Sequence, residues 1–314
     1  MTSPLTLRPS TVDALRLAGL DPDYVTDVVA RALDEDLAGG VDATTAATVP
    51  IGRTDTADLV ARTAGVVAGI PVATAAFDVV GRAAADALTA DLTEGSVIDV
   101  LPSAVEGARV RPGDVLLTVH GPTRALLTAE RTALNLLCHL SGVATLTRAW
   151  ADAIAGTGAR VRDTRKTTPG LRALEKYAVR RGGGENHRMS LSDSALIKDN
   201  HVAVAGGVAA AFAAVRHAFA DLPVQVECDS VDELAAAVAA GADLVLLDNM
   251  STTDLRRAVE LARPRRVRLE ASGGLTLDRA REVAETGVDY LAVGALTHSA
   301  PALDVGMDLR ERPA

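Results

Sequence analysis

The segment Asp163–His201 reads DTRKTTPGLRALEKYAVRRGGGENHRMSLSDSALIKDNH and is the part of the chain richest in charge. Eight Lys and Arg residues and two His residues fall within it, although the whole chain has a net charge of −9 at pH 7. Clustered like charges repel one another, so a basic cluster in an acidic chain is typical of an anion-binding site. The central part alone, Arg172–Arg181, could equally be a solvated basic face of a helix.

Both ends of this segment follow short apolar runs that are typical of β-strands. Asp163 comes directly after Ala159–Arg162, and Lys198 comes directly after Ala195–Ile197. Four more runs of this kind follow, at Val224–Val226, Leu244–Leu247, Val267–Leu269 and Tyr290–Val293. Helical patterns separate the later runs, and alternating strands and helices predict a parallel sheet with right-handed crossovers.

The length of the chain decides between a closed and an open barrel. A chain of 314 residues suits two domains. A closed eight-unit barrel takes about 250 residues, and only about 140 are available after residue 159. We therefore predict an incomplete, open α/β barrel over residues 131–299. Residues 1–130 are predicted to form a sandwich-like α+β domain, joined by the C-terminal tail, about 300–314.

A polar or glycine-containing element follows each predicted strand. In sequence order the candidates are Thr164, Arg165 and Lys166; Lys198; Glu227; Asp248; Ser272, Gly273 and Gly274; and Gly294, Ala295 and Leu296. In α/β barrels the active site lies at the carboxyl ends of the strands. Any one of these carboxylates could instead cap the next helix, but six polar strand ends in register predict an active site.

The residue types indicate the chemistry. Small residues at Ser272–Gly274 and Gly294–Leu296 would let backbone N–H groups approach a phosphate. Glu227 and Asp248 are one strand apart and would suit ribose hydroxyls, Mg²⁺ or a developing positive charge. The basic cluster would suit an anion with more than one carboxylate, because an arginine can grip a carboxylate with two hydrogen bonds.

Four short motifs, DTRKTTPGLR, EKYAV, GGGENHR and LIKDNH, resemble the quinolinate phosphoribosyltransferase family, as does ERTALNLLCHLSGVAT at residues 130–145. The resemblance extends over about residues 20–310. It implies the open barrel, and it implies transfer of phosphoribosyl from phosphoribosyl pyrophosphate to quinolinate with decarboxylation. The products would be nicotinate mononucleotide, pyrophosphate and CO₂, in the de novo biosynthesis of NAD.

The resemblance also implies roles for individual residues. It assigns the dicarboxylate to Arg165, His187, Arg188 and Lys198, and to Arg131 reaching in from a neighbouring subunit. It assigns the phosphoribosyl group to Lys166, Glu227, Asp248, Ser272–Gly274 and Gly294–Leu296. Among these, Glu227, Asp248 and Lys166 are the catalytic candidates. Mg²⁺ is expected as the cofactor, held mainly by the substrate pyrophosphate and possibly by Glu227 and Asp248. A homodimer with shared sites, or a higher oligomer, is expected.

Two other functions remain open from the residues. One is a barrel lyase that forms a Schiff base on Lys198 or Lys166, which would need an apolar setting that lowers the pKa of the lysine. The other is a related phosphoribosyltransferase with another substrate, or a non-catalytic binder.

Composition narrows the class of protein further. Apolar residues make up 48% of the chain, enough for a sizeable core, and aromatic residues only 2%. The acidic balance and the few aromatic residues argue against nucleic-acid binding. The first residues lack the apolar run of a secretory signal, and no apolar run reaches the roughly 18 residues of a membrane span. We expect a cytoplasmic protein that does not interact with membranes.

Overall fold

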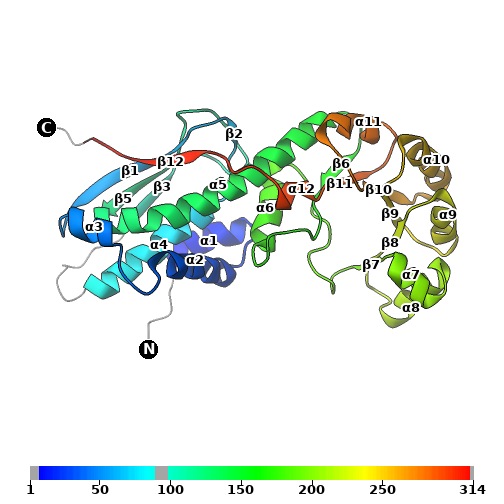
Figure 1. Ribbon diagram of the computed structural model, residues 1–314, viewed down its shortest axis with the longest axis horizontal. Coiled ribbons are helices and arrows are strands. Elements are labelled where there is room, and N and C mark those ends of the chain that lie inside the picture. The colour runs from blue at the N-terminus through cyan, green and yellow to red at the C-terminus, as the bar shows by residue number, and fades with distance from the viewer. Residues whose placement is uncertain (1–6, 89–97, 312–314) are drawn as a thin grey trace. The chain divides into compact units, whose positions relative to one another are not determined.

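The computed structural model describes residues 7–88 and 98–311 and divides the chain into two compact units (Figure 1). Unit 1 comprises Met1–Thr145, Pro169–Gly182 and Ala300–Ala314, and unit 2 comprises Leu146–Thr168 and Gly183–Ser299. Helix α5 (Thr123–Ala153) begins in unit 1 and ends in unit 2. The predicted boundary at residue 130 therefore falls within one unbroken helix, and the units divide further along it.

Unit 1 contains a four-stranded antiparallel sheet in the order β12-β1-β5-β3. Its strands are β1 (Thr54–Ala61), β3 (Asp99–Pro102), β5 (Val115–Pro122) and β12 (Val305–Leu309). Alternate residues of β1 are buried, as expected for a strand with one face against a core. Pairing of β12 with β1 places the C-terminal tail in this unit. A smaller ladder joins β2 (Gly65–Val66) to β4 (Arg109–Val110).

The other helices of unit 1 are α1 (Pro9–Leu17), α2 (Pro22–Leu37), α3 (Ala43–Thr48), α4 (Ile70–Leu88) and α6 (Arg172–Gly182). The start of α2 follows from its sequence, since the Asp21 carboxylate accepts a hydrogen bond from Asp23 N and Pro22 occupies the first turn. Helices α1 and α2 both pack on α4. Unit 1 is thus an α+β layer structure, as predicted.

Unit 2 is built on a six-stranded parallel sheet in the order β6-β11-β10-β9-β8-β7. The strands are β6 (Arg160–Arg162), β7 (Ala195–Ile197), β8 (Val224–Cys228), β9 (Leu244–Asp248), β10 (Arg268–Ser272) and β11 (Tyr290–Ala292). All six correspond to the runs predicted from sequence. The sheet is open between β6 and β7, which are its two edges, so the predicted open α/β barrel is confirmed.

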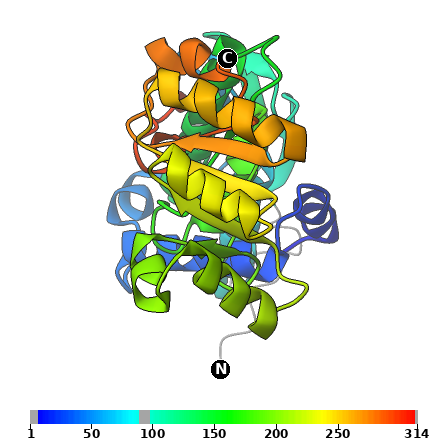
Figure 2. The ribbon, with the colours of Figure 1, turned by 90° about the vertical axis from the view of Figure 1, so that its right-hand side faces the viewer.

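One face of this sheet is covered by helices (Figure 2). They are α8 (Val208–Ala218), α9 (Val231–Ala239), α10 (Thr252–Ala262) and α11 (Ala280–Ala284), and each packs against a strand and against a neighbouring helix of this set. Ser230 and Ser251 cap α9 and α10 by accepting backbone hydrogen bonds. Two short helices complete the unit, α7 (Asp199–Ala205) and α12 (Ala295–His298).

Helix α6 groups with unit 1. The predicted barrel domain, residues 131–299, includes this helix because its sequence lies between two barrel strands. Its residues Leu174–Val179 are buried, and the His139 ring lies 2.9 Å from the buried Glu175 carboxylate. The helix is therefore not a solvated basic face.

Within the described residues, no single helix is long and apolar enough to span a membrane. The pair α7 and α8 reaches that length and composition only when joined across a bend of 89°.

Candidate active site

The inward face of the unit 2 sheet, opposite the helices, carries three of the candidate residues. Strand register places Glu227, Leu246, Glu270 and Tyr290 in one row. Side chains at two-residue intervals share a face of a sheet. The same face therefore also carries Arg162, Gln225, Asp248 and Ser272. The alternate residues, such as Val226, Leu247 and Ala271, are apolar and buried.

Three candidates expected after the strands in fact lie within them, at or next to the last residue. Glu227, Asp248 and Ser272 lie within β8, β9 and β10. The strands extend this far because polar side chains are tolerated on the inward face. As strand residues, these groups are paired with a neighbouring strand, which fixes their directions.

The segment Gly183–Arg188 is anchored to the edge of the sheet by Asp163. This carboxylate is fully buried and accepts hydrogen bonds from His187 N at 2.9 Å and Asn186 Nδ2 at 2.5 Å. Glu185 forms a parallel bridge with Arg162. The structure therefore places His187 and Arg188 beside the end of β6, where Thr164 and Arg165 follow.

Arg165 and Arg188 form the cationic part of the site. Burial lowers the pKa of the Arg188 guanidinium, and the neighbouring charge of Arg165 lowers it further. Arg188 Nη1 donates to Ser194 O at 3.0 Å, which orients its side chain. Two guanidinium groups that repel each other across a partly buried site gain by binding an anion between them.

Lys198 and Glu227 form an ion pair, with Nζ 2.9 Å from Oε2. The Lys198 side chain is 46% exposed and that of Glu227 is 19% exposed, so the pair opens to solvent at the end of the sheet. Asp248 lies one strand further along and accepts a hydrogen bond from Asn249 Nδ2 at 2.7 Å. The order of strands β7, β8 and β9 therefore places Lys198, Glu227 and Asp248 at one end of adjacent strands, as predicted.

The turn after β10 requires glycine. Gly273 has a φ of +86°, and a Cβ atom there would overlap the Asn249 side chain. Gly274 also has a positive φ, at +58°. The chain thus passes close to the end of β9, with Asn249 N donating to Ser272 O at 2.9 Å. Such a turn leaves its backbone accessible to a close ligand, as expected for phosphate binding.

Lys166 lies beside the turn after β11. Its Cδ atom would be 3.1 Å from a Cβ on Gly294, and its carbonyl accepts a hydrogen bond from Thr297 Oγ1 at 2.7 Å. Thr164 Oγ1 accepts from Lys166 N at 3.0 Å, which shapes the turn after β6. The Leu296 side chain is fully buried, so this residue can offer a ligand only its backbone.

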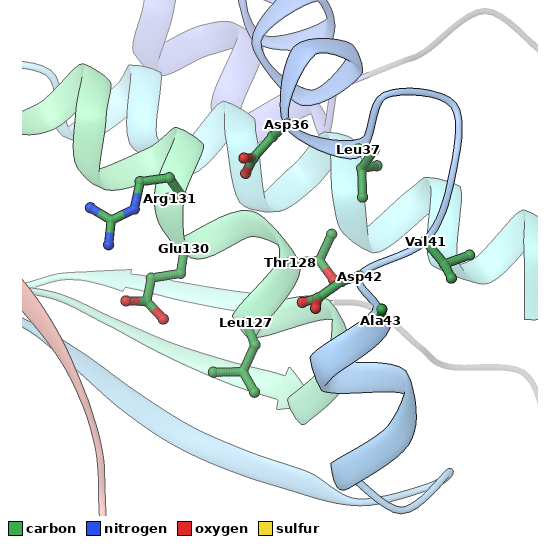
Figure 3. A pocket seen from close by; sticks show the side chains of 9 residues that line it. All are labelled: Asp36, Leu37, Val41, Asp42, Ala43, Leu127, Thr128, Glu130 and Arg131. Atoms are coloured by element: carbon green, nitrogen blue, oxygen red, sulfur yellow. The ribbon is translucent and has the colours of Figure 1, made fainter.

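Arg131 lies in unit 1, on α5, apart in sequence from the unit 2 candidates (Figure 3). It is exposed and lines a cavity of about 500 Å³ together with three carboxylates, those of Asp36, Asp42 and Glu130. Within residues 7–88 and 98–311, no acceptor forms a hydrogen bond or ion pair with its guanidinium. Its contribution to a neighbouring subunit stays a prediction.

Three polar residues of the inward face were given no role from sequence: Arg162, Gln225 and Glu270. Glu270 is fully buried, and its Oε2 accepts from Arg162 Nη1 and Gln225 Nε2, both at 3.0 Å. A usable signal was present in the chain, because Gln225 precedes Glu227 by two residues and Glu270 precedes Ser272 by two. In a strand that spacing means a shared face.

The carboxylates at this end of the sheet suit Mg²⁺. No group of three or more His, Cys, Asp or Glu side chains in the described part of the chain could hold a metal ion. Glu227 and Asp248 offer two carboxylates on one face. This fits Mg²⁺, which is commonly held by one or two carboxylates plus substrate phosphates.

Comparison with known proteins identifies the family. Residues 42–141 match the model for the N-terminal domain of quinolinate phosphoribosyl transferase, and residues 143–308 match the model for its C-terminal domain. The chain belongs to the quinolinate phosphoribosyltransferase family. The resemblance noted from the motifs is therefore confirmed.

Individual relatives agree with this family. The chain is 52% identical over 295 residues to the carboxylating nicotinate-nucleotide pyrophosphorylase of Mycobacterium leprae, covering 93% of this chain and all of the relative. It is 39% identical to the probable enzyme of that name from Bacillus subtilis, over 81% and 83% of the two chains. The solved nicotinate-nucleotide pyrophosphorylase of Francisella tularensis superposes with a TM-score of 0.83 at 36% identity, covering 92% and 96% of the chains.

Proposed function

We propose that the inward face of the unit 2 sheet carries out the reaction of this family, with the residue roles set out below. The chain transfers the phosphoribosyl group of phosphoribosyl pyrophosphate to quinolinate and releases pyrophosphate and CO₂, giving nicotinate mononucleotide. Membership of the family over both domains supports this reaction, and the identity of 52% to a carboxylating relative supports its direction and substrates. A Schiff-base lyase and a non-catalytic binder are disfavoured by the same membership.

The dicarboxylate is bound by Arg165, His187, Arg188 and Lys198. The observation that carries this assignment is the proximity of Arg165 to the partly buried Arg188, whose pKa is lowered first by burial and then by the Arg165 charge. Quinolinate has two adjacent carboxylates and can satisfy both guanidinium groups at once. Lys198, now paired with Glu227, can exchange that partner for a substrate carboxylate because the pair is partly exposed.

The phosphoribosyl group lies against Glu227, Asp248, Lys166 and the two turns, Ser272–Gly274 and Gly294–Leu296. The ring nitrogen of quinolinate forms a bond to C1 of the ribose as the bond from C1 to the pyrophosphate oxygen breaks. Positive charge develops on the ribose in that step, and the Glu227 and Asp248 carboxylates stabilise it electrostatically. The pyridinium then accepts the electron pair left by the departing 2-carboxylate, and a proton takes its place on the ring.

Mg²⁺ is the proposed cofactor, held mainly by the substrate pyrophosphate; Glu227 and Asp248 are the residues that would supply protein ligands. When bound, the ion would neutralise charge on the leaving pyrophosphate. The cytoplasm is the proposed compartment.

The direct test is to incubate the purified protein with quinolinate, phosphoribosyl pyrophosphate and MgCl₂ and to detect nicotinate mononucleotide and CO₂ in equal amounts. Omitting quinolinate is the control. Consumption of quinolinate without nicotinate mononucleotide would contradict the assigned reaction. Replacement of MgCl₂ by a chelator should abolish turnover, and full activity under chelation would remove the proposed cofactor.

We further propose a homodimer in which Arg131 completes the site of the neighbouring subunit. Arg131 is exposed and without an ion-pair partner among the described residues, so it is available to an anion outside its own unit. A two-fold pair would give two identical sites.

Complementation tests this arrangement. Arg131→Ala and Arg165→Ala should each be nearly inactive. After verified subunit exchange, an equal mixture should recover about a quarter of wild-type activity, because half of the dimers are mixed and each mixed dimer has one intact site, if sites are independent. No recovery after exchange would rule out the shared site.

A further inference from the structure

Glu270 is held from both sides across the interior of the open barrel. Its side chain is fully buried in the middle of β10. Arg162 on β6 and Gln225 on β8 lie two strands away on either side, and both donate to Glu270 Oε2 at 3.0 Å. Arg162 also stacks on the Tyr290 ring, with Cζ 3.7 Å from the ring centre. The carboxylate therefore has a fixed position beneath the substrate-binding end of the sheet.

The second oxygen of Glu270 is directed to His187. Glu270 Oε1 is buried and accepts no hydrogen bond from the described residues, and His187 Nε2 lies 3.5 Å from it. The His187 side chain is only 9% exposed. A buried carboxylate oxygen without a full hydrogen bond is costly, which is typical of a group kept for a function rather than for stability.

The other ring nitrogen of His187 fixes where its proton lies. The backbone N–H of Arg188 donates to His187 Nδ1 at 2.8 Å. A backbone N–H can only donate, so Nδ1 must accept, and in the neutral ring the proton is on Nε2. That N–H faces Glu270 Oε1, with Nε2 3.5 Å away.

We propose that Glu270 is a positioning residue for the transferase reaction. It holds the His187 ring with Nε2–H toward Oε1 and Nδ1 toward the Arg188 backbone N–H, and so fixes Arg188 at the dicarboxylate site. Glu270 itself does not touch the substrate, since it is fully buried. Arg162 and Gln225 keep the carboxylate from turning toward another partner. The inference rests on the proposed function, in which His187 and Arg188 bind the dicarboxylate.

The alternative is that Glu270 only neutralises the buried Arg162. Two variants separate the roles. Glu270→Gln keeps the shape but loses the charge. Glu270→Asp keeps the charge for Arg162 but is one methylene shorter, so it should not reach His187. Glu106→Gln is the matched control, because Glu106 is the carboxylate of a hydrogen-bonded network in unit 1 that has no contact with His187.

The experiment measures KM for quinolinate and for phosphoribosyl pyrophosphate, together with proton–nitrogen NMR spectra of histidine-labelled protein. Loss of such a supporting contact typically costs about 10- to 100-fold. We expect a rise of that size in KM for quinolinate in both Glu270 variants, with KM for phosphoribosyl pyrophosphate changed by less than about threefold. Glu270→Asp should recover thermal stability relative to Glu270→Gln but not the KM, and Glu106→Gln should leave both constants unchanged.

Three results would overturn the proposal: an unchanged KM for quinolinate in folded Glu270→Gln, recovery of the KM in Glu270→Asp, or a wild-type spectrum with the His187 proton on Nδ1. The spectrum needs no variant, so it decides even if Glu270→Gln does not fold. Wild-type protein that makes no nicotinate mononucleotide would instead contradict the proposed function and is seen before any variant is made.

Discussion

Each unit of the chain contains a glutamate held in a polar network, and the two networks differ in what surrounds the carboxylate. In unit 1, Glu106 accepts hydrogen bonds from Gly69 N at 3.1 Å and Ile70 N at 2.6 Å and from the Tyr177 hydroxyl. It caps the start of α4, where backbone N–H groups lack helical partners. In unit 2, Glu270 is held by side chains of other strands, and one of its oxygens lacks a hydrogen bond among the described residues.

The comparison shows two different roles for a buried glutamate carboxylate. Burial raises the pKa of the Glu106 carboxyl. The Tyr177 hydroxyl is also buried, and its burial and the nearby Glu106 charge raise its pKa. The cost at Glu106 is offset by backbone donors, so this network stabilises the fold. The network at Glu270 connects to His187 instead, so it serves the site. Changes on the inward face of unit 2 should therefore alter kinetics, whereas changes at Glu106 should alter stability.

The largest effect should come from Glu227 and Asp248. Changing either to Ala removes a carboxylate that faces developing positive charge, and kcat should fall by about 100- to 1,000-fold, as for loss of one electrostatic contact in a transition state. Binding of quinolinate, measured by calorimetry, should weaken much less. Both side chains are partly exposed, so the melting temperature should change little. A preserved kcat with lost quinolinate binding would reverse the roles assigned here.

A smaller effect, on stability rather than rate, is expected for Glu106→Ala. The variant leaves the N–H groups of Gly69 and Ile70 without their acceptor, which should cost about 1–3 kcal/mol in the free energy of unfolding. Denaturant titration measures the loss, and Glu35→Gln at an exposed position of α2 is the control. The kcat of the folded fraction should match the wild type. A lower kcat in Glu106→Ala without a loss of stability would contradict the proposed difference between the two networks.

The smallest effect belongs to an exposed ion pair of unit 1. Hydrogen bonds from Arg310 lower the pKa of Asp58, with Nε 2.8 Å from Oδ2. A carboxyl whose pKa is lower in the folded state adds stability above its unfolded pKa, and this is lost as pH falls through the folded pKa. Arg310→Met should therefore reduce the melting temperature slightly at pH 7 and converge with the wild type in acid. A gap that widens in acid would contradict this assignment.

Much of unit 2 could be predicted because its signals are local. Short apolar runs such as Leu244–Leu247 mark buried parallel strands, and the polar residue after each run marks the end where a ligand binds. The placement of Glu227, Asp248 and the Gly273 turn follows from those signals. The family motifs supplied the substrate, which spacing alone could not.

The remainder depends on contacts between residues far apart in the chain. Helix α6 groups with unit 1 because Tyr177 bonds to Glu106 and Glu175 contacts His139, and neither partner lies near it in sequence. The link from Glu270 to Arg162 spans 108 residues and that to Gln225 spans 45. It depends on strand order, which the sequence pattern does not specify residue by residue.

The central claim is that the cationic groups at the end of the unit 2 sheet, Arg165, His187, Arg188 and Lys198, select a dicarboxylate. The ratio of kcat/KM for quinolinate to that for nicotinate tests it most directly, because both substrates give nicotinate mononucleotide and one assay serves both. Nicotinate lacks the 2-carboxylate, and each lost charge-assisted hydrogen bond costs about 1.5–3 kcal/mol. We expect kcat/KM for quinolinate to exceed that for nicotinate by at least about tenfold. In Arg188→Met we expect this ratio to be smaller. Equal values of kcat/KM for the two substrates in the wild-type protein would contradict it.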